Sequence, residues 1–89
     1  MKTLYNTTKL DGYTLKYYLT AETIYGLSYY GIMLTSEGDN ASYTAQISGI
    51  FPYETNAVAL LAYLFKHNVT PLSMKDAVME YMDEKFIIR

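Results

Sequence analysis

Few side chains in this sequence belong to the types that perform catalysis or bind metal ions. His67 is the single histidine, and there is no cysteine. A lone histidine without a serine or cysteine nucleophile beside it makes no catalytic triad, and without cysteine no recognisable zinc cluster can form around it. We interpret His67 as a residue placed favourably at the end of a helix, where a positive charge suits the helix dipole. The sequence therefore predicts no metal site.

Four acidic residues lie at helical spacing near the C-terminus: Asp76, Glu80, Asp83 and Glu84. Paired carboxylates can hold calcium or perform acid–base catalysis. These four have no binding loop and no apolar pocket to shift a pKa, so an exposed helix face is the better interpretation. The five glycines show no phosphate-loop spacing. We therefore expect no cofactor and no enzymatic activity.

The unusual feature of the composition is its eleven tyrosines in 89 residues. Some belong to the predicted core, but others are predicted on the opposite face of a sheet, together with a lysine and two apolar residues. This candidate partner-binding surface consists of Lys16, Tyr18, Leu27, Tyr29 and Met33. Tyrosine and methionine are enriched at protein interfaces, so the first interpretation is a protein partner or a homodimer.

Two other interpretations of the same tyrosines remain open. Tyrosines on a sheet can stack the bases of single-stranded nucleic acid. Such surfaces are basic, and here only Lys16 supplies charge, so nucleic acid is the weaker alternative. The third interpretation is a monomer whose tyrosines are solvated and bind nothing.

The length and composition indicate one domain, residues 1–89, stabilised by packing alone. The net charge is −2 and no strongly basic segment points to nucleic acid or to a membrane surface. The longest apolar run, from Ala57 to Phe65, is about half of what a membrane span needs. With no signal-like segment at the N-terminus and no cysteine, a cytoplasmic location is expected.

The periodicity of apolar residues changes near Pro52, from a period of two to a period of 3.6. Strands are predicted at about 13–20, 27–35 and 41–50, and helices at about 54–67 and 71–83. The predicted fold class is α+β: a three-stranded antiparallel sheet made of two hairpins, followed by two helices packed on one face.

The strand registers can be predicted because facing residues in a hairpin have a constant sum of residue numbers. A turn centred between Thr23 and Ile24 pairs Tyr17 with Tyr30, and on the other face Tyr18 with Tyr29. A turn centred between Asp39 and Asn40 completes the second hairpin. Both registers share one buried face, with the pairs Leu15–Ile32, Leu34–Ala45 and Ile32–Ile47. We expect Leu15, Tyr17, Ile32, Leu34, Ala45 and Ile47 to be mostly buried.

The connection between the helices carries its own signals. Asn68 is suited to end the first helix in the left-handed region. Thr70 is predicted as the N-cap of the second helix, with Pro71 at its first position. Residues 86–88 form a short apolar tail that we expect to add to a sheet edge or to cover the core.

Three short segments resemble a family of small uncharacterised bacterial proteins, a domain of unknown function. They are Tyr17-Tyr18-Leu19-Thr20, Tyr30-Gly31-Ile32 before a hairpin, and Asn68-Val69-Thr70-Pro71 leading into Asp76-Ala77-Val78. The resemblance spans residues 17–84 and implies a fold but no activity. Members of such a family typically have a second strand rich in Glu and Lys. This chain instead has Met33 and Thr35 there, so its outer face is expected to differ.

Overall fold

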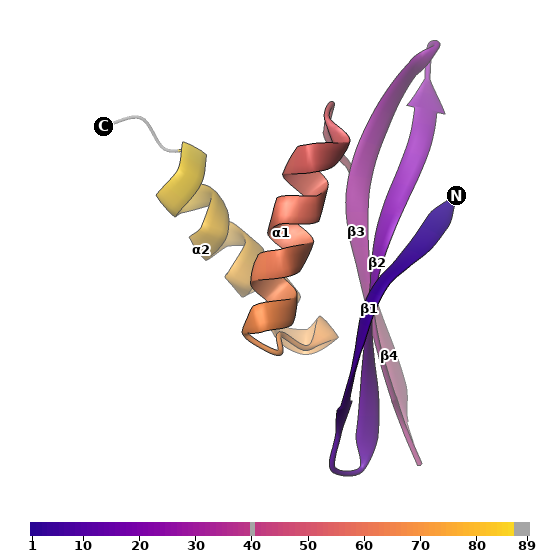
Figure 1. Ribbon diagram of the computed structural model, residues 1–89, viewed down its shortest axis with the longest axis vertical. Coiled ribbons are helices and arrows are strands. Elements are labelled where there is room, and N and C mark those ends of the chain that lie inside the picture. The colour runs from indigo at the N-terminus through magenta and orange to yellow at the C-terminus, as the bar shows by residue number, and fades with distance from the viewer. Residues whose placement is uncertain (40, 87–89) are drawn as a thin grey trace.

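The computed structural model describes residues 1–39 and 41–86, which form an antiparallel sheet followed by helices on one of its sides (Figure 1). The strands are β1 (Lys2–Leu10), β2 (Tyr13–Ile24), β3 (Leu27–Gly38) and β4 (Ser42–Phe51). Helix α1 (Glu54–Lys66), the 3-10 helix η1 (Pro71–Ser73) and helix α2 (Met74–Phe86) follow. The α+β class is confirmed, but the three-stranded sheet is wrong: the described residues form four strands in the order β1-β2-β3-β4.

The additional strand, β1, pairs with β2 and forms one edge of the sheet. Its sequence contains threonines, an asparagine and two lysines, and it lacks the apolar alternation that marks a half-buried strand. A bulge between Leu4 and Asn6 also shifts which side chains face each side of the sheet. The Asp11-Gly12 pair, just before the first predicted strand, is the turn of a further hairpin, since Leu10 faces Tyr13.

The predicted register between β2 and β3 is wrong, although the predicted faces are right. The two strands are joined at Tyr25 and Gly26, which have φ values of 51° and 79°. Two successive left-handed residues are the requirement of a tight hairpin turn. Tyr17 therefore faces Leu34 instead of Tyr30, and Ile24 faces Leu27. This displacement of four residues is an even number, so each side chain stays on its predicted side.

The register between β3 and β4 agrees with the prediction, with Ile32 facing Ile47 and Leu34 facing Ala45. The ladder shifts between Tyr30 and Ile32, and Gly31 lies at this irregularity. A Cβ atom on Gly31 would lie 2.2 Å from the Ile47 carbonyl oxygen and 2.9 Å from Ser48 Cα. Glycine is thus needed at position 31 because the backbone of β4 passes too close for any side chain.

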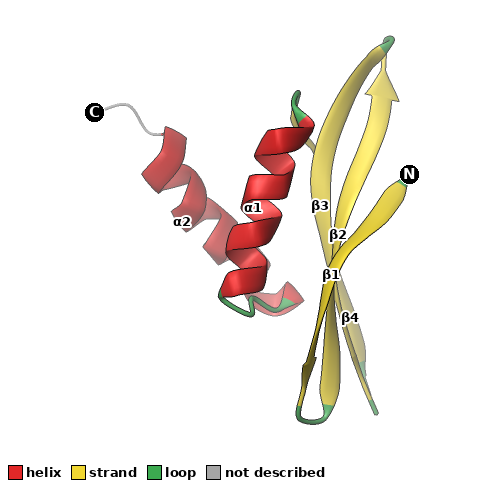
Figure 2. Ribbon diagram, viewed as in Figure 1, coloured by secondary structure: helices red, strands yellow, loops and turns green. Residues whose placement is uncertain are grey.

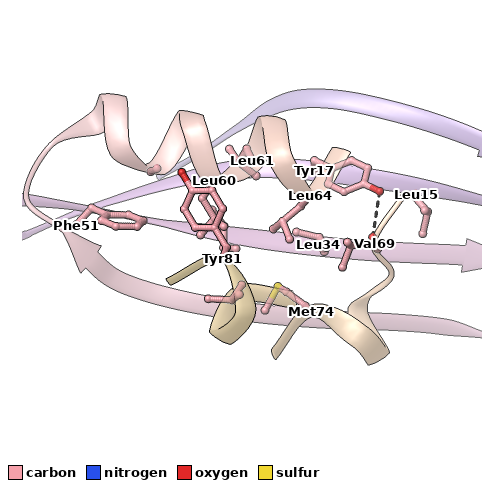
Figure 3. Packing of buried hydrophobic residues seen from close by; sticks show 13 residues of the cluster. Leu15, Tyr17, Leu34, Phe51, Leu60, Leu61, Leu64, Val69, Met74 and Tyr81 are labelled. Carbon is pink, nitrogen blue, oxygen red and sulfur yellow. Dashed lines mark hydrogen bonds between the residues drawn. The ribbon is translucent and has the colours of Figure 1, made fainter. Parts of the chain in front are cut away.

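The core forms where α1 covers the inner face, the side of the sheet that carries both helices (Figure 2). Almost fully buried residues come from β2, β3 and α1: Leu15, Tyr17, Ile32, Leu34, Leu60, Leu61 and Leu64 (Figure 3). Ala45 and Ile47 are only half-buried, since β4 is an edge strand. Helix α2 packs on α1 through Met74, Val78 and Tyr81. Residues 87 and 88 of the expected apolar tail lie outside the described residues.

The C-terminus of α1 is closed by backbone hydrogen bonds and tied to the sheet. Asn68 has a φ of 51°, as predicted, and its N–H donates to the Phe65 carbonyl. The Val69 N–H donates to the Leu64 carbonyl, which completes the arrangement known as a Schellman motif. The Tyr17 hydroxyl donates to the Val69 carbonyl at 3.0 Å, inside the core (Figure 3). One buried side chain of β2 therefore fixes the position where the chain leaves α1.

The predicted capping role of Thr70 is wrong in its mechanism. Thr70 occupies the N-cap position of η1, but its hydroxyl makes no hydrogen bond to a backbone N–H. It instead contacts the Ser73 hydroxyl at 3.4 Å, at an exposed position. The backbone supplies the turn, because the Ser73 N–H donates to the Thr70 carbonyl.

Thr70→Ala is consequently expected to change the free energy of unfolding by less than about 0.5 kcal/mol, the range of ordinary surface substitutions. A true capping threonine would cost about 0.5–2 kcal/mol on the same substitution. Urea denaturation of both proteins measures the difference. A loss above 1 kcal/mol would show that the hydroxyl caps the helix after all.

Candidate functional site

The face of the sheet that is turned away from the helices, called the outer face here, is not covered by any element of residues 1–39 and 41–86 (Figures 1 and 2). All five residues of the predicted partner-binding surface belong to it by strand alternation: Lys16, Tyr18, Leu27, Tyr29 and Met33. They do not form one exposed patch, however. The structure divides them into a closed middle part and an open end.

The middle of the outer face is covered by its own side chains. Tyr18 faces Met33, and not Tyr29 as predicted; it also faces Leu4 of β1. The Lys2 ammonium lies 4.7 Å from the centre of the Tyr18 ring, a cation–π contact. Met33 is 8% exposed, so the prediction that it is open to a partner is wrong. The cross-strand neighbours of Met33 are Tyr18 of β2 and Gln46 of β4, and the Tyr18 ring is itself covered by Lys2 of β1, a strand that the sequence did not reveal.

Lys16 is half-buried on the same face and forms an ion pair with Glu37, with 3.6 Å between Nζ and Oε1. Strand β1 adds Lys2 and Lys9 to this side of the sheet. Glu22 and Glu37 lie on the same face, so its three lysines are largely balanced, and two of them already contact a partner within the chain.

The open end of the outer face is the tip of the β2–β3 hairpin, residues 24–27, which extends beyond the helices (Figure 1). The exposed fractions there are 43% for Ile24, 100% for Tyr25 and 61% for Leu27. Tyr29, half-exposed, faces Glu22 just below the tip. Large apolar side chains therefore gather where a hairpin usually carries polar turn residues. Ile24 and Tyr25 were missed because the predicted strand ended at residue 20.

Between the closed middle and the hairpin tip lies a shallow hollow of about 420 Å³. Its lining includes Lys2, Thr20, Glu22, Gln46 and Ser48, with the buried Met33 beneath. Gly31, which faces Thr20, leaves this part of the sheet without a side chain. The Gln46 amide donates to the Ser48 hydroxyl at 2.9 Å, so these two polar groups are partly satisfied.

A second hollow of about 370 Å³ lies on the inner face, between the far end of the sheet and η1. Its lining is mostly apolar and includes Tyr13, Tyr43, Pro71 and Leu72. Tyr43 belongs to the inner face by strand alternation, but the helices do not reach it. It is instead half-exposed at the rim of this hollow.

The residues first considered for chemistry do not converge on a site. His67 lies beside Tyr63, with 4.7 Å between the ring centres. Burial, followed by the charges of Glu80 and Glu84, raises the pKa of the Tyr63 hydroxyl. In the part of the chain that the structure describes, no group of three or more His, Cys, Asp or Glu side chains could hold a metal ion. Within the same residues, no helix has the length and apolar character needed to cross a membrane.

Residues 1–84 match the model of a family of unknown function (DUF6514). The chain belongs to this family. The predicted membership of a domain of unknown function is thereby confirmed, and the match includes β1, which lies outside the segments that carried the resemblance. Comparison of this family member with curated proteins and with solved structures found no match.

Proposed function

We propose that the protein is a small non-enzymatic interaction module of the cytoplasm, which binds a protein partner through the hairpin tip and the adjoining part of the outer face. The observation that carries the proposal is the exposure of Ile24, Tyr25 and Leu27 together at a projecting tip. Exposed apolar groups gathered in this way mark interaction sites in soluble proteins. The absence of cysteine suits the reducing compartment.

The geometry favours a protein over nucleic acid as the partner. Tyr25 is an aromatic residue of the kind enriched at the centre of protein interfaces, and Leu27 adds exposed apolar area beside it. Stacking of a base on Tyr18 would have to displace Lys2 from its ring, and the ion pair with Glu37 lowers the charge that Lys16 can offer to phosphate. Nucleic acid therefore remains the alternative, through the outer-face lysines and Tyr18.

The double substitution Tyr25→Ser and Leu27→Lys is expected to lower recovery of bound partner at least tenfold, because it removes both exposed anchors. The free energy of unfolding should change by no more than about 0.5 kcal/mol, since the side chains are on the surface. Affinity purification from native lysate with quantitative mass spectrometry measures recovery, and thermal unfolding measures stability.

The matched control is Tyr53→Ser with Met79→Lys, which alters two exposed apolar residues on the helical side of the molecule. Its partner recovery should equal that of the unmodified chain. Equal recovery by the tip variant and the control would place the binding surface elsewhere. Salt-dependent oligonucleotide binding that is lost in Tyr18→Ala would favour the alternative function.

A further inference from the structure

The two edges of the sheet differ in how they are protected against pairing with another strand. Strand β1 carries Lys2 and Lys9 and contains a bulge. Charged residues and bulges are devices that keep an edge strand from pairing with other chains. Strand β4, at the other edge, has no charged residue from Ser42 to Phe51, and proline first occurs at position 52, beyond its end. The β1 edge is therefore protected against pairing with another strand, and the β4 edge is not.

The β4 edge, meaning the side of Ser42–Ser48 that does not pair with β3, presents unpaired backbone groups in the described part of the chain. Residues 44–48 are the part of this edge that a two-fold axis at Gln46 pairs with itself. The irregularity near Gly49 ends the straight segment. Exposed N–H and C=O groups in such a row can pair with any extended strand that brings no unpaired charge.

We propose that the β4 edge pairs with the β4 edge of a second copy of this chain, in antiparallel orientation. The sequence of the strand is self-complementary about Gln46: a two-fold axis there places Ala45 opposite the partner's Ile47 and Thr44 opposite the partner's Ser48. Apolar residues then meet on the inner side and hydroxyl groups on the outer side. No charged pair is created, whereas pairing with the lysine-bearing β1 edge would bring ammonium groups to the junction.

The pairing joins two sheets of four strands into one continuous sheet. Because the two-fold axis is perpendicular to the sheet, all helices stay on one side and both outer faces lie on the other. The contact is symmetric and closes at two chains. Exposed Tyr43 and Leu72, which border the inner-face hollow beside β4, come to lie next to the junction. The dimer uses a different surface from the hairpin tip, and it would present two tips to one partner.

The experiment compares the chain with the variant Thr44→Lys, Ser48→Lys, in which each new lysine faces a lysine of the partner. The control, Thr3→Lys with Asn6→Lys, adds the same charge to exposed positions of the β1 edge. Analytical ultracentrifugation over a hundredfold range of concentration gives the mass, and hydrogen exchange gives the protection of β4 amides. We expect a mass twice that of one chain for the unmodified protein and for the control, and a single-chain mass for the β4 variant. Protection of β4 amides should rise with protein concentration in the first two only.

Three outcomes would overturn the proposal. The first is a single-chain mass for the unmodified protein at millimolar concentration. The second is protection of the β4 edge that does not depend on concentration, which would mean that the chain covers its own edge. The third is a dimer that survives in the β4 variant but dissociates when Tyr25→Ser and Leu27→Lys are introduced, which would assign the dimer contact to the hairpin tip. If the tip variant loses partner recovery but keeps the dimer mass, the result supports both proposals and shows that the two surfaces are separate.

Discussion

Replacement of Gly31 by alanine is expected to lower the free energy of unfolding by about 3 kcal/mol or more, the upper range for overpacking. The new Cβ would lie 2.2 Å from the Ile47 carbonyl oxygen and 2.9 Å from the Ser48 Cα atom. Both are backbone atoms, so the clash cannot be relieved by a rotamer change and β4 must move away from β3. Against a total stability of about 5–15 kcal/mol, this loss is large.

Urea denaturation measures the effect as a shift of the midpoint at constant slope. Ser28→Ala is the matched control, because it places alanine at an exposed position of the same strand. That variant should stay within about 0.5 kcal/mol of the unmodified chain. If Gly31→Ala were equally mild, the close approach of β4 at this position would be incorrect.

Removal of the Tyr17 hydroxyl is the second substitution with a large expected effect. In Tyr17→Phe the Val69 carbonyl loses its donor inside the core, at the junction between α1 and the sheet. An unsatisfied buried acceptor costs about 1–3 kcal/mol. The ring itself is kept, so its T-shaped contact with the Phe65 ring should persist. Urea denaturation at pH 7 measures the loss, and Tyr43→Phe, with its exposed hydroxyl, is the control.

The same residue predicts how stability depends on alkaline pH. Burial, together with a smaller contribution from Tyr13, raises the pKa of Tyr17 from 10.0 to about 12. Between these values the unfolded chain releases the proton while the folded chain keeps it, so stability is complete below pH 10 and falls as the pH rises towards 12. Two pKa units correspond to about 3 kcal/mol at most.

Tyr17→Phe should lack this part of the alkaline loss, and its stability curve should converge with that of the unmodified protein as the pH approaches 12. Denaturation midpoints collected from pH 8 to pH 12 test this, with Tyr43→Phe again as control. Parallel curves for Tyr17→Phe and the unmodified chain would mean that the phenol of Tyr17 titrates normally in the folded state.

The inner face and the helices could be predicted from the sequence because burial of one side of an element spaces its apolar residues periodically. Leu15, Tyr17, Ile32 and Leu34 are buried as expected, and helix α1 begins and ends within one residue of the expected bounds. A register error of an even number of residues leaves every side chain on its side of the sheet. The predicted faces were therefore right although the predicted β2–β3 turn was wrong.

The outer face could not be predicted to the same depth, for two physical reasons. An edge strand that buries little has no apolar period, so β1 was not predicted, and neither were the positions of Leu4 and Lys2 beside Tyr18. The tight turn at Tyr25 and Gly26 was hidden because tyrosine is a poor left-handed residue. The candidate surface was therefore predicted on the correct side of the sheet, but it was centred on Tyr18 and Met33 instead of the hairpin tip.

The neighbour-to-neighbour order of the strands has a consequence for synthesis of the chain. Each strand pairs with the strand made immediately before it, so the sheet can assemble from the N-terminus as the chain leaves the ribosome. The inner face has no cover until α1 has been made, and the Tyr17–Val69 hydrogen bond joins residues 52 positions apart. During that interval a nascent sheet exposes Leu15, Ile32 and Leu34 to water, and the length of the interval is set by the time needed to make the chain from β4 to the end of α1.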